Sequence, residues 1–312
     1  MAKIKNTKIK DTFGDRVLNV IVGTILVLWT IIVLYPVLYV IAASMSSSAA
    51  IEAGMVSLWP VKDATTGAFG ISDEAFRFVL AYKQVWIGYR NSIFYTVCDL
   101  IIQMTSTVLI AYPLSRRYYH CRGFVGMFFF MATRFSAGMI PTFILKCDLG
   151  LFDNIWAVII GNSIAFGHVM MLRVAITSSV PNDLFDAAMI DGANHFHCIF
   201  NIVLPLTKAT LSVLCLYTMV GQWNEFFTSM LFLRDANLYP LQLVLRPIMT
   251  AATSAGSVDV SGMSSSYQDQ ANGGLENVRY ALIIISTAPV IILYSFVQKA
   301  FKGGVMMGSL KG

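Results

Sequence analysis

The sequence has few charged residues for its length. Only 12% of its 312 residues are Asp, Glu, Lys or Arg, whereas 56% are hydrophobic and the mean hydropathy is +0.67. A water-soluble domain has about twice that charged fraction. The apolar residues also fall in blocks, as membrane spans require. The composition therefore excludes a soluble globular or disordered chain and indicates an integral membrane protein.

The sequence also lacks the motifs of several chemical functions. Its five cysteines show no C-x-x-C spacing, which indicates reduced thiols. It contains no G-x-x-x-x-G-K-[ST] loop for binding ATP and no H-E-x-x-H metal motif, and we expect His195 and His197 to be exposed polar residues on a loop. The basic residues form no aromatic-interleaved patch. We therefore expect no metal, no cofactor and no nucleic-acid partner for this chain.

Six apolar runs are long enough to cross a hydrocarbon core of about 30 Å as helices of about 20 residues. β-Barrel strands would be half as long and would alternate in polarity. The first run is also too long for the core of a signal peptide. The sequence therefore predicts an all-α integral membrane protein with six transmembrane helices, over residues 17–43, 91–114, 123–145, 154–172, 209–233 and 280–297.

These runs define one transmembrane domain, residues 17–298, between a basic N-terminal segment (1–16) and a C-terminal tail (299–312). An even number of spans places both termini on one side, and the loops of that side carry most of the Lys and Arg residues. The positive-inside rule then places both termini in the cytoplasm. Two external loops, 44–90 and 234–279, are long. Within the second, a Ser/Gly/Ala-rich run (250–274) predicts a mobile loop that can contact an external protein.

The cytoplasmic loop between the fourth and fifth spans, about 178–208, is neither random nor of low complexity. Pro181 and the following Asn182 or Asp183 predict the start of a helix, and Gly192 predicts its end. Small residues around the turn allow another backbone to approach closely. This pattern indicates a docking element and not a catalytic site. The predicted apolar face of the helix consists of Leu184, Phe185, Ala188 and Ile190.

This loop resembles the cytoplasmic loop of the inner-membrane permease subunits of binding-protein-dependent ABC importers. The motif E-A-A-x-x-x-G with its extension D-G-A-x5-F-x-x-I-x-L-P is matched without gaps by Ala187, Ala188, Asp191, Gly192, Ala193, Ile202, Leu204 and Pro205. Asp186 stands where Glu is usual, and Ile199 where Phe is usual. The resemblance implies a coupling helix that contacts a separate ATPase through Asp186, Ala187, Ala188, Asp191, Gly192 and Ala193.

The resemblance continues along nearly the whole chain, through AYPLSR (111–116), GMIPTF (138–143), GQWNEFF (221–227) and LYPLQLVLR (238–246). These stretches are similar to the carbohydrate branch, the MalG-like permeases, and more similar still to the LplC/YtcP group. The resemblance implies a type I ABC importer permease in the bacterial inner membrane that is not itself an enzyme. It also implies a second, different permease, two ATPase subunits that bind ATP and Mg, a solute-binding protein, and a sugar substrate, expected to be an oligosaccharide.

Four residues are candidates for the substrate pathway. Arg134 is a charge within the third predicted span, where it costs about 2.5–3.5 kcal/mol unless it faces water or protein. Trp223, Asn224 and Glu225 are consecutive, and an aromatic ring beside an amide suits a sugar. On one continuous helix, Trp223 would share a face with Phe227 and pack in part, while Asn224 and Glu225 would border the aqueous path. The alternative is that these residues make structural contacts between helices.

A function of another class is a non-ABC secondary transporter or channel. It would use Asp99, Arg134 and Glu225 as a charge relay within the membrane. An ion-coupled carrier has no need of the DAAMIDGA loop, whereas an ABC permease depends on such a loop. The loop therefore favours the ABC permease.

Overall fold

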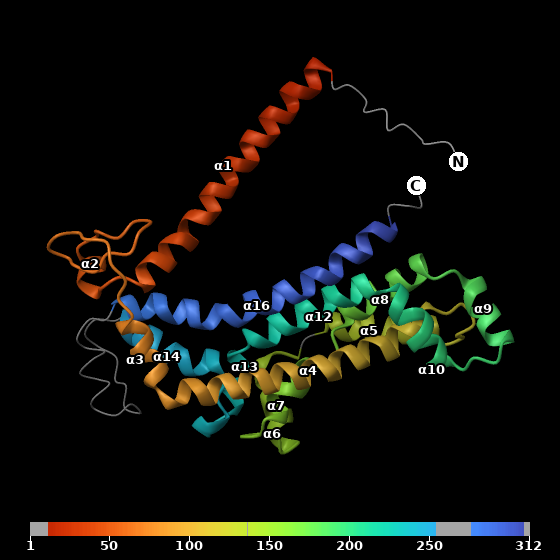
Figure 1. Ribbon diagram of the computed structural model, residues 1–312. Helices are drawn as coiled ribbons and strands as arrows, with labels where there is room; N and C mark the ends of the chain where they lie inside the picture. Colours follow the sequence, from red (N-terminus) through yellow and green to blue (C-terminus); the bar gives the residue numbers. More distant parts are fainter. Residues whose placement is uncertain (1–11, 136, 254–275, 309–312) are drawn as a thin grey trace. The chain divides into compact units, whose positions relative to one another are not determined.

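The computed structural model describes residues 12–135, 137–253 and 276–308. Within these residues the chain is helical, apart from turns and one isolated antiparallel bridge between Val61 and Phe69 (Figure 1). The described residues divide into two compact units. The first consists mainly of residues 12–78 and 276–284, and the second mainly of residues 79–251 and 285–308.

The first unit contains the long helix α1 (Phe13–Ser44) and the short helix α2 (Ser48–Glu52). Most apolar side chains of α1 between residues 17 and 38 are exposed around the whole helix. A helix that is hydrophobic on all sides requires lipid or another protein around it. Only the C-terminal end of α1 packs within the unit, where it forms an apolar cluster made of Ala42, Ala43, Ala50, Ile51, Val56 and Val61.

Within this unit, the end of α1 is tied to the start of α16 (Glu276–Gly308). Asn277 is fully buried, and its Nδ2 donates to the Ser46 carbonyl at 3.0 Å while its Oδ1 accepts from Ser48 Oγ at 3.0 Å. The rings of Tyr39 and Tyr280 meet edge to face with their centroids 5.8 Å apart. A buried amide with both of its groups bonded fixes the relative position of these two segments.

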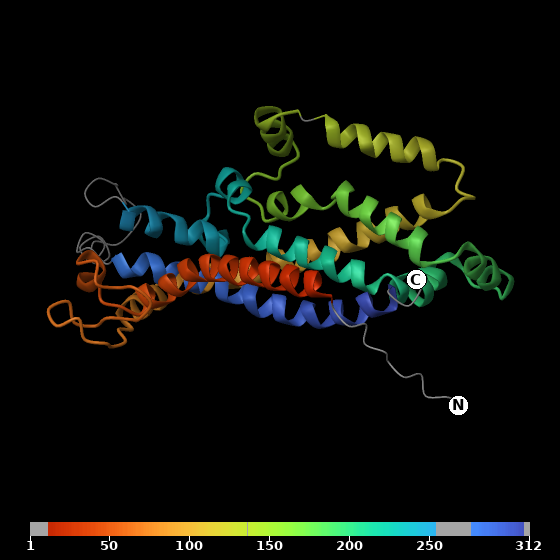
Figure 2. The same ribbon diagram turned by 90° about the horizontal axis from the view of Figure 1, so that it is seen from above.

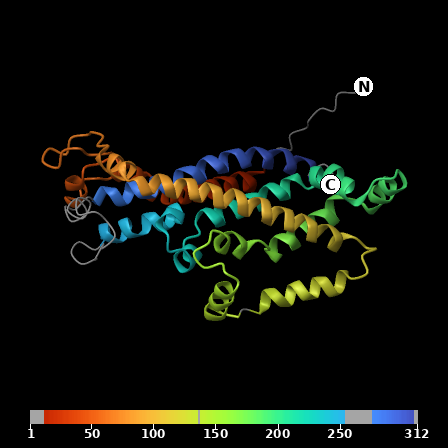
Figure 3. The same ribbon diagram turned by 90° about the horizontal axis from the view of Figure 1, so that it is seen from below.

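The second unit is built around α4 (Lys83–Ser115), which packs against α8 (Phe166–Ser179) and α12 (Lys208–Trp223). Figures 2 and 3 show these three helices side by side, with α5 (Arg122–Arg134) and α6 (Met139–Asp148) beside them. The main core is formed by apolar residues of these three helices and of the segment between α8 and α12. It includes Ala111, Leu114, Val169, Leu172, Ile176, Val203 and Leu214.

Shorter elements connect the long helices. They are α3 (Glu74–Ala81), α7 (Trp156–Ile159), the 3-10 turn η1 (Ile160–Asn162), α9 (Asn182–Ile190), α10 (His195–Cys198), the π-helical turn η2 (Ile199–Val203), α11 (Leu204–Leu206), α13 (Phe227–Phe232), the 3-10 turn η3 (Ala236–Leu238) and α14 (Leu241–Thr253).

Three of the helices, α1, α4 and α16, are individually long and apolar enough to cross a membrane. Two bent pairs, α5 with α6 and the segment His195–Leu206 with α12, raise this number to five in the described part of the chain. The prediction of one continuous helix over residues 154–172 is wrong. There the chain forms α7 and η1, breaks at residues 163–165, and continues as α8 to Ser179. Gly161, Asn162 and Ser163 are weak helix formers, which explains the break.

The predicted external loops contain more helix than expected. The stretch 44–90 includes α2, α3 and the first turns of α4, and the stretch 234–279 includes η3 and α14. Residues 250–253 of the Ser/Gly/Ala-rich run end α14, and the rest of the run lies outside the described residues, as do residues 1–11 and 309–312. The predicted C-terminal tail begins as helix, since α16 continues to Gly308.

Candidate coupling and translocation sites

The helix predicted in the cytoplasmic loop is α9, and its predicted start and end are confirmed. It begins after Pro181, with Asp183 in its first turn, where a carboxylate is favourable near the helix N-terminus. At its end, Ala193 N donates to Ala188 O at 2.9 Å and Gly192 N donates to Met189 O at 3.1 Å. Gly192 has a φ of 83°. These two bonds and the positive φ define a Schellman motif, which glycine terminates without strain.

The predicted apolar face of α9 is divided between two sides of the helix. Phe185 is buried, and Ala188, three residues later, packs against the same core. Leu184 and Ile190 are instead exposed, Ile190 by 86%. The prediction that all four residues share one face is therefore wrong for Ile190, which the helical period places about 140° from Phe185 and about 160° from Ala188. Leu184 lies one turn before Ala188 on the same row, at the edge of the buried face, and is 42% exposed. Of the residues matched to the coupling motif, Ala188 and Ala193 are half-buried, and the exposed ones are Asp186, Ala187, Asp191 and Gly192.

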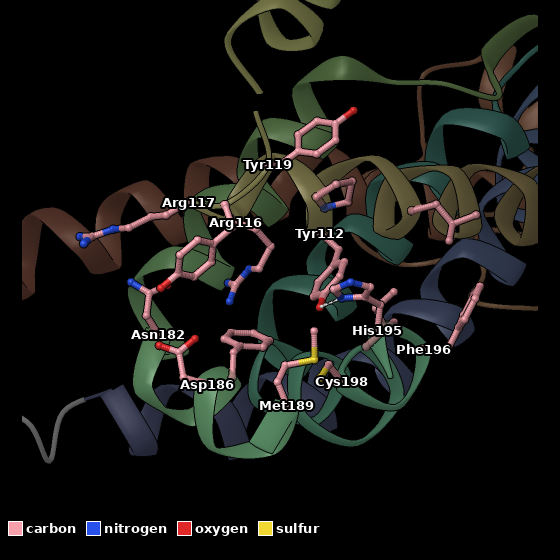
Figure 4. Close-up of a pocket in the computed structure, with 15 residues that line it drawn as sticks. Tyr112, Arg116, Arg117, Tyr119, Asn182, Asp186, Met189, His195, Phe196 and Cys198 are labelled. Atoms are coloured by element: carbon pink, nitrogen blue, oxygen red, sulfur yellow. Dashed lines mark hydrogen bonds between the residues drawn. The ribbon is translucent and has the colours of Figure 1, made fainter. Parts of the chain in front are cut away.

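The inner side of α9 contacts the end of α4. The guanidinium carbon of Arg116, the residue that follows α4, lies 3.4 Å from the ring centroid of Phe185 and 5.6 Å from that of Tyr112. Burial lowers the pKa of Arg116, whereas Tyr112, Cys198 and Asp186 raise it. The Tyr112 hydroxyl also lies 3.1 Å from Nδ1 of His195. These contacts join α4, α9 and α10 (Figure 4).

The same residues line a cavity of about 700 Å³, which also includes Arg117, Tyr118, Tyr119, Asn182, Asp186 and Met189 (Figure 4). The sequence indicated Arg116 only as the end of the AYPLSR stretch and did not predict its contact with Phe185 of α9. His195 is exposed, as predicted, although it also bonds to Tyr112. His197 is exposed, and its Nδ1 lies 3.0 Å from Nδ2 of Asn201. Among the described residues, no group of three or more His, Cys, Asp or Glu side chains could hold a metal ion.

The four candidate pathway residues lie in different surroundings. Arg134 is the last residue of α5 and is exposed, with its guanidinium carbon 5.2 Å from the ring centroid of Phe130 on the same helix. Trp223 is buried, and its Nε1 donates to the Ser286 carbonyl at 3.0 Å. Its ring also lies 6.2 Å from that of Tyr89. Trp223 is therefore a packing residue between helices.

Asn224 and Glu225 lie at a helix break. The prediction of one helix over residues 209–233 is wrong, because α12 ends at Trp223 and α13 begins at Phe227. Asn224 is exposed and its Nδ2 donates to the Val220 carbonyl at 2.8 Å, while Glu225 Oε1 accepts from Thr228 N at 2.5 Å. Glu225 thus bonds a free amide in the first turn of α13, whereas Asn224 adds a second donor to the Val220 carbonyl, which also accepts from Asn224 N at 3.2 Å. The argument from a shared helical face does not apply to them.

A polar pocket instead lies between α4, α8 and α12. It has a volume of about 290 Å³ and includes none of the four predicted pathway residues. Sequence reasoning had singled out only Asp99 among its residues. The missed signal is a polar stripe on α4, whose members from Ser92 onward are three or four residues apart and are therefore on one face of the helix. Its buried members are Asn91, Ser92, Thr96, Asp99, Gln103 and Thr107.

Comparison with known proteins gives the family. Residues 85–306 match the model of the binding-protein-dependent transport system inner membrane component. The chain is 30% identical over 301 residues to the polygalacturonan/rhamnogalacturonan transport system permease protein YtcP of Bacillus subtilis, covering 96% of this chain and 99% of YtcP. It is also 30% identical to the protein LplC of the same organism, covering 90% of each chain.

A solved structure agrees with this result. One chain in the crystal structure of a bacterial ABC transporter involved in the import of the acidic polysaccharide alginate superposes with a TM-score of 0.80 and 31% identity, over 94% of this chain and 100% of that chain. The family match decides against the non-ABC transporter or channel. The chain belongs to the family of binding-protein-dependent transport system inner membrane components, and it is an ABC importer permease of the type I fold and not an enzyme.

Proposed function

We propose that this chain is one of two different permease subunits of an oligosaccharide importer and forms half of its translocation pathway. The names of its relatives support a carbohydrate of more than one residue. YtcP is named for polygalacturonan and rhamnogalacturonan, and another relative, GanQ of Bacillus subtilis, is named for galactooligosaccharides. In this proposal, a solute-binding protein delivers the sugar from outside, and two ATP-binding subunits bind ATP and Mg and hydrolyse the ATP.

The observation that carries the proposed coupling is the two-sided character of α9. Its outer side presents Ile190, which is 86% exposed although it is large and apolar, and Leu184 lies at the edge between the two sides and is 42% exposed. Exposed apolar groups of this kind mark a site for a protein partner. Its inner side is held to the end of α4 through Phe185 and Arg116. Movement of α9 by an ATPase subunit would therefore be passed to α4.

The same proposal sets the orientation in the membrane. ATP is hydrolysed in the cytoplasm, so α9 must lie on the cytoplasmic side. The positive-inside rule gives the same side for this loop and for both termini. Closure of the ATPase pair favours the outward-facing pathway, and hydrolysis returns it inward, because the subunits bind the two conformations with different affinities.

Co-purification tests the coupling assignment. We expect Ile190→Glu to release the ATP-binding subunits from the detergent-solubilised complex while the partner permease stays bound, because a charge replaces the most exposed apolar contact of α9. The matched control is Ile190→Val, which keeps an apolar side chain and should retain the ATP-binding subunits. Normal recovery of these subunits and normal stimulation of ATP hydrolysis with Ile190→Glu would remove α9 as the docking helix.

Thermal-shift screening tests the substrate class. The solute-binding protein encoded alongside this chain should be stabilised by an oligosaccharide, since a ligand that binds only the folded protein raises its unfolding temperature. Stabilisation by a non-carbohydrate solute alone would contradict the proposed substrate class and leave the permease assignment intact.

A further inference from the structure

One face of α4 carries polar side chains through a segment that should be apolar in a membrane helix. Four of them, Asp99, Gln103, Thr96 and Thr107, are at most 4% exposed. Polar groups in a membrane span are costly unless they are bonded or face water or a ligand. The partners of these groups therefore indicate what the face is for.

At the N-terminal end of the stripe, the polar side chains of Asn91, Ser92 and Tyr95 form hydrogen bonds with the segment after α13. Asn91 Nδ2 donates to the carbonyls of Asn237 at 2.7 Å and Tyr239 at 3.0 Å. Ser92 Oγ accepts from Leu241 N at 2.8 Å, and the Tyr95 hydroxyl donates to the Leu238 carbonyl at 2.8 Å. This end of α4 thus uses its polar groups to hold η3 and the start of α14.

The next part of the stripe faces the polar pocket. Its polar and aromatic lining comes from three helices of the second unit, with Asp99 and Gln103 on α4, His168 on α8, and Tyr217, Thr218 and Gln222 on α12. Asp99 and Gln222 are 2% and 7% exposed, yet Oδ1 of Asp99 and Oε1 of Gln222 accept no hydrogen bond within the described residues. Nδ1 of His168 also has no partner there.

The two oxygens are not bonded to each other or to another side chain of the pocket. Of the two hydroxyl groups that α12 contributes to the lining, Oγ1 of Thr218 donates to Oε1 of Gln103, and that of Tyr217 bonds to neither oxygen. The pocket therefore presents acceptors that need donors from a molecule inside it. A structural polar network would have bonded these atoms to each other.

The aromatic side of the pocket complements its acceptors. The rings of Tyr217 and His168 are stacked with their centroids 6.3 Å apart and an angle of 24° between them, and Tyr217 is 55% exposed. An aromatic face next to hydrogen-bond acceptors matches a molecule with an apolar C–H face and an edge of hydroxyl groups. A pyranose ring has both features.

We propose that this pocket binds one residue of the transported sugar through its hydroxyl groups, with Asp99 and Gln222 as acceptors and Tyr217 as the stacking surface. This inference rests on the proposed function. The volume of about 290 Å³ lies at the lower end of ligand pockets, which span about 300–1,000 Å³. It suits a single sugar residue, so an oligosaccharide would pass through it one residue at a time. A transport site must also release its ligand, which favours few contacts.

Three variants in the full importer, reconstituted with its partner subunits, test this site. The probes are labelled oligogalactosides and oligogalacturonides, and uptake of whichever probe the wild type transports is measured together with ATP hydrolysis. Asp99→Leu and Gln222→Leu each remove the acceptor oxygen and keep a side chain of similar size, and each should lower the uptake about tenfold, the effect of one lost hydrogen bond of ordinary strength. Stimulated ATP hydrolysis should stay at the wild-type level, so that fewer sugars enter per ATP.

Thr107→Val is the matched control. Thr107 is fully buried on the same face of α4 and its Oγ1 is also without a partner among the described residues, but it does not line the pocket. Its replacement should leave uptake unchanged. Unchanged uptake in Asp99→Leu and Gln222→Leu would show that the pocket holds only water. An equal loss of uptake, ATP hydrolysis and subunit recovery would show a structural role, and either result overturns the site.

Tyr217 provides a second test that does not disturb a buried residue. Tyr217→Phe keeps the aromatic face and should retain uptake, whereas Tyr217→Ala should lose it. Equal uptake by both variants would remove the stacking surface from the proposal. A failure of the proposed function gives a different result from a failure of this pocket. The wild-type importer itself would then take up none of the sugar probes.

Discussion

Arg116 and Phe185 stack directly on each other, with the guanidinium carbon 3.4 Å from the centre of the ring, although they are 69 positions apart in the sequence. The contact joins the end of the longest helix of the second unit to the inner side of α9. A planar guanidinium on an aromatic ring contributes about 0.5–2 kcal/mol, and lysine does not replace its shape. The pair therefore connects α9, the proposed coupling helix, directly to the end of a membrane span.

Arg116→Ala should weaken that link. We expect the ATP-binding subunits to remain bound, because the outer side of α9 is unchanged, while sugar uptake per ATP hydrolysed falls. The control is Arg117→Ala, which removes the neighbouring charge from an exposed position. The measurement is the ratio of uptake to ATP hydrolysis in proteoliposomes. Equal ratios for Arg116→Ala and Arg117→Ala would show that the stacked pair transmits nothing.

Gly192 should tolerate only residues that accept a positive φ. A Cβ atom at Gly192 would meet nothing within 4 Å, so the cost of a side chain comes from the backbone and not from crowding. Gly192→Val should therefore destabilise the end of α9 by about 1–2 kcal/mol, while Gly192→Asn should be nearly neutral. Recovery of the ATP-binding subunits by co-purification checks this. If Asn is as damaging as Val, a side chain at this position obstructs the partner subunit instead.

The parts of the coupling loop that sequence predicted correctly depend on local signals. Pro181 and Gly192 act on the backbone of their own residues, so the limits of α9 follow from the sequence. The division of its apolar residues could not be seen in the same way. Whether Phe185 or Ile190 faces inward depends on where the end of α4 lies, and this is a tertiary contact.

The helix break beside the predicted pathway residues was missed for a related reason. Hydropathy averaged over residues 209–233 predicts one helix, but Asn224 and Glu225 bond to backbone groups and divide the segment. Along α4, the same averaging conceals the polar stripe. A search for polar residues three or four positions apart would have found it. Asp99 was noticed because it is charged, whereas Gln222 became significant only when α12 was placed against α4.

Asp153 should make the joint between the α6–α7 loop and the segment after α13 sensitive to acid. Its Oδ1 accepts hydrogen bonds from Arg234 N at 2.8 Å and Asp235 N at 3.1 Å, and these bonds hold its pKa below the ordinary 3.8. A carboxyl with a lowered folded-state pKa stabilises the protein above its unfolded-state pKa, and this stabilisation is lost as the pH falls through the folded-state value.

The comparison variant is Asp153→Asn, which keeps an acceptor oxygen and tolerates the positive φ of 53° at this residue, but does not titrate. Thermal unfolding of both proteins in detergent, from about pH 6 to about pH 3, should show the advantage of the wild type disappearing at the acid end. A constant difference across this range would mean that the carboxylate charge contributes nothing to the joint.

Gly88 should be needed for the close approach of α4 to α14. A Cβ atom there would lie 3.0 Å from Leu241 Cα and 3.2 Å from Leu241 N, the same amide that donates to Ser92 Oγ. Replacing a helical glycine by alanine otherwise stabilises a helix by about 1 kcal/mol. Overpacking costs about 1–3 kcal/mol, so the crowding should outweigh the gain and Gly88→Ala should lower the unfolding temperature.

Gly126 of α5 provides the opposite case, because a Cβ atom there would meet nothing within 4 Å. Gly126→Ala should therefore gain the higher helix propensity of alanine without any crowding. The variant should unfold at the same temperature as the wild type or at a higher one. Thermal unfolding of the two variants in the same detergent measures the difference directly. If Gly88→Ala is as stable as Gly126→Ala, the contact between α4 and Leu241 can relax without loss. The hydrogen bond from Leu241 N to Ser92 would then not depend on the absence of a side chain at position 88.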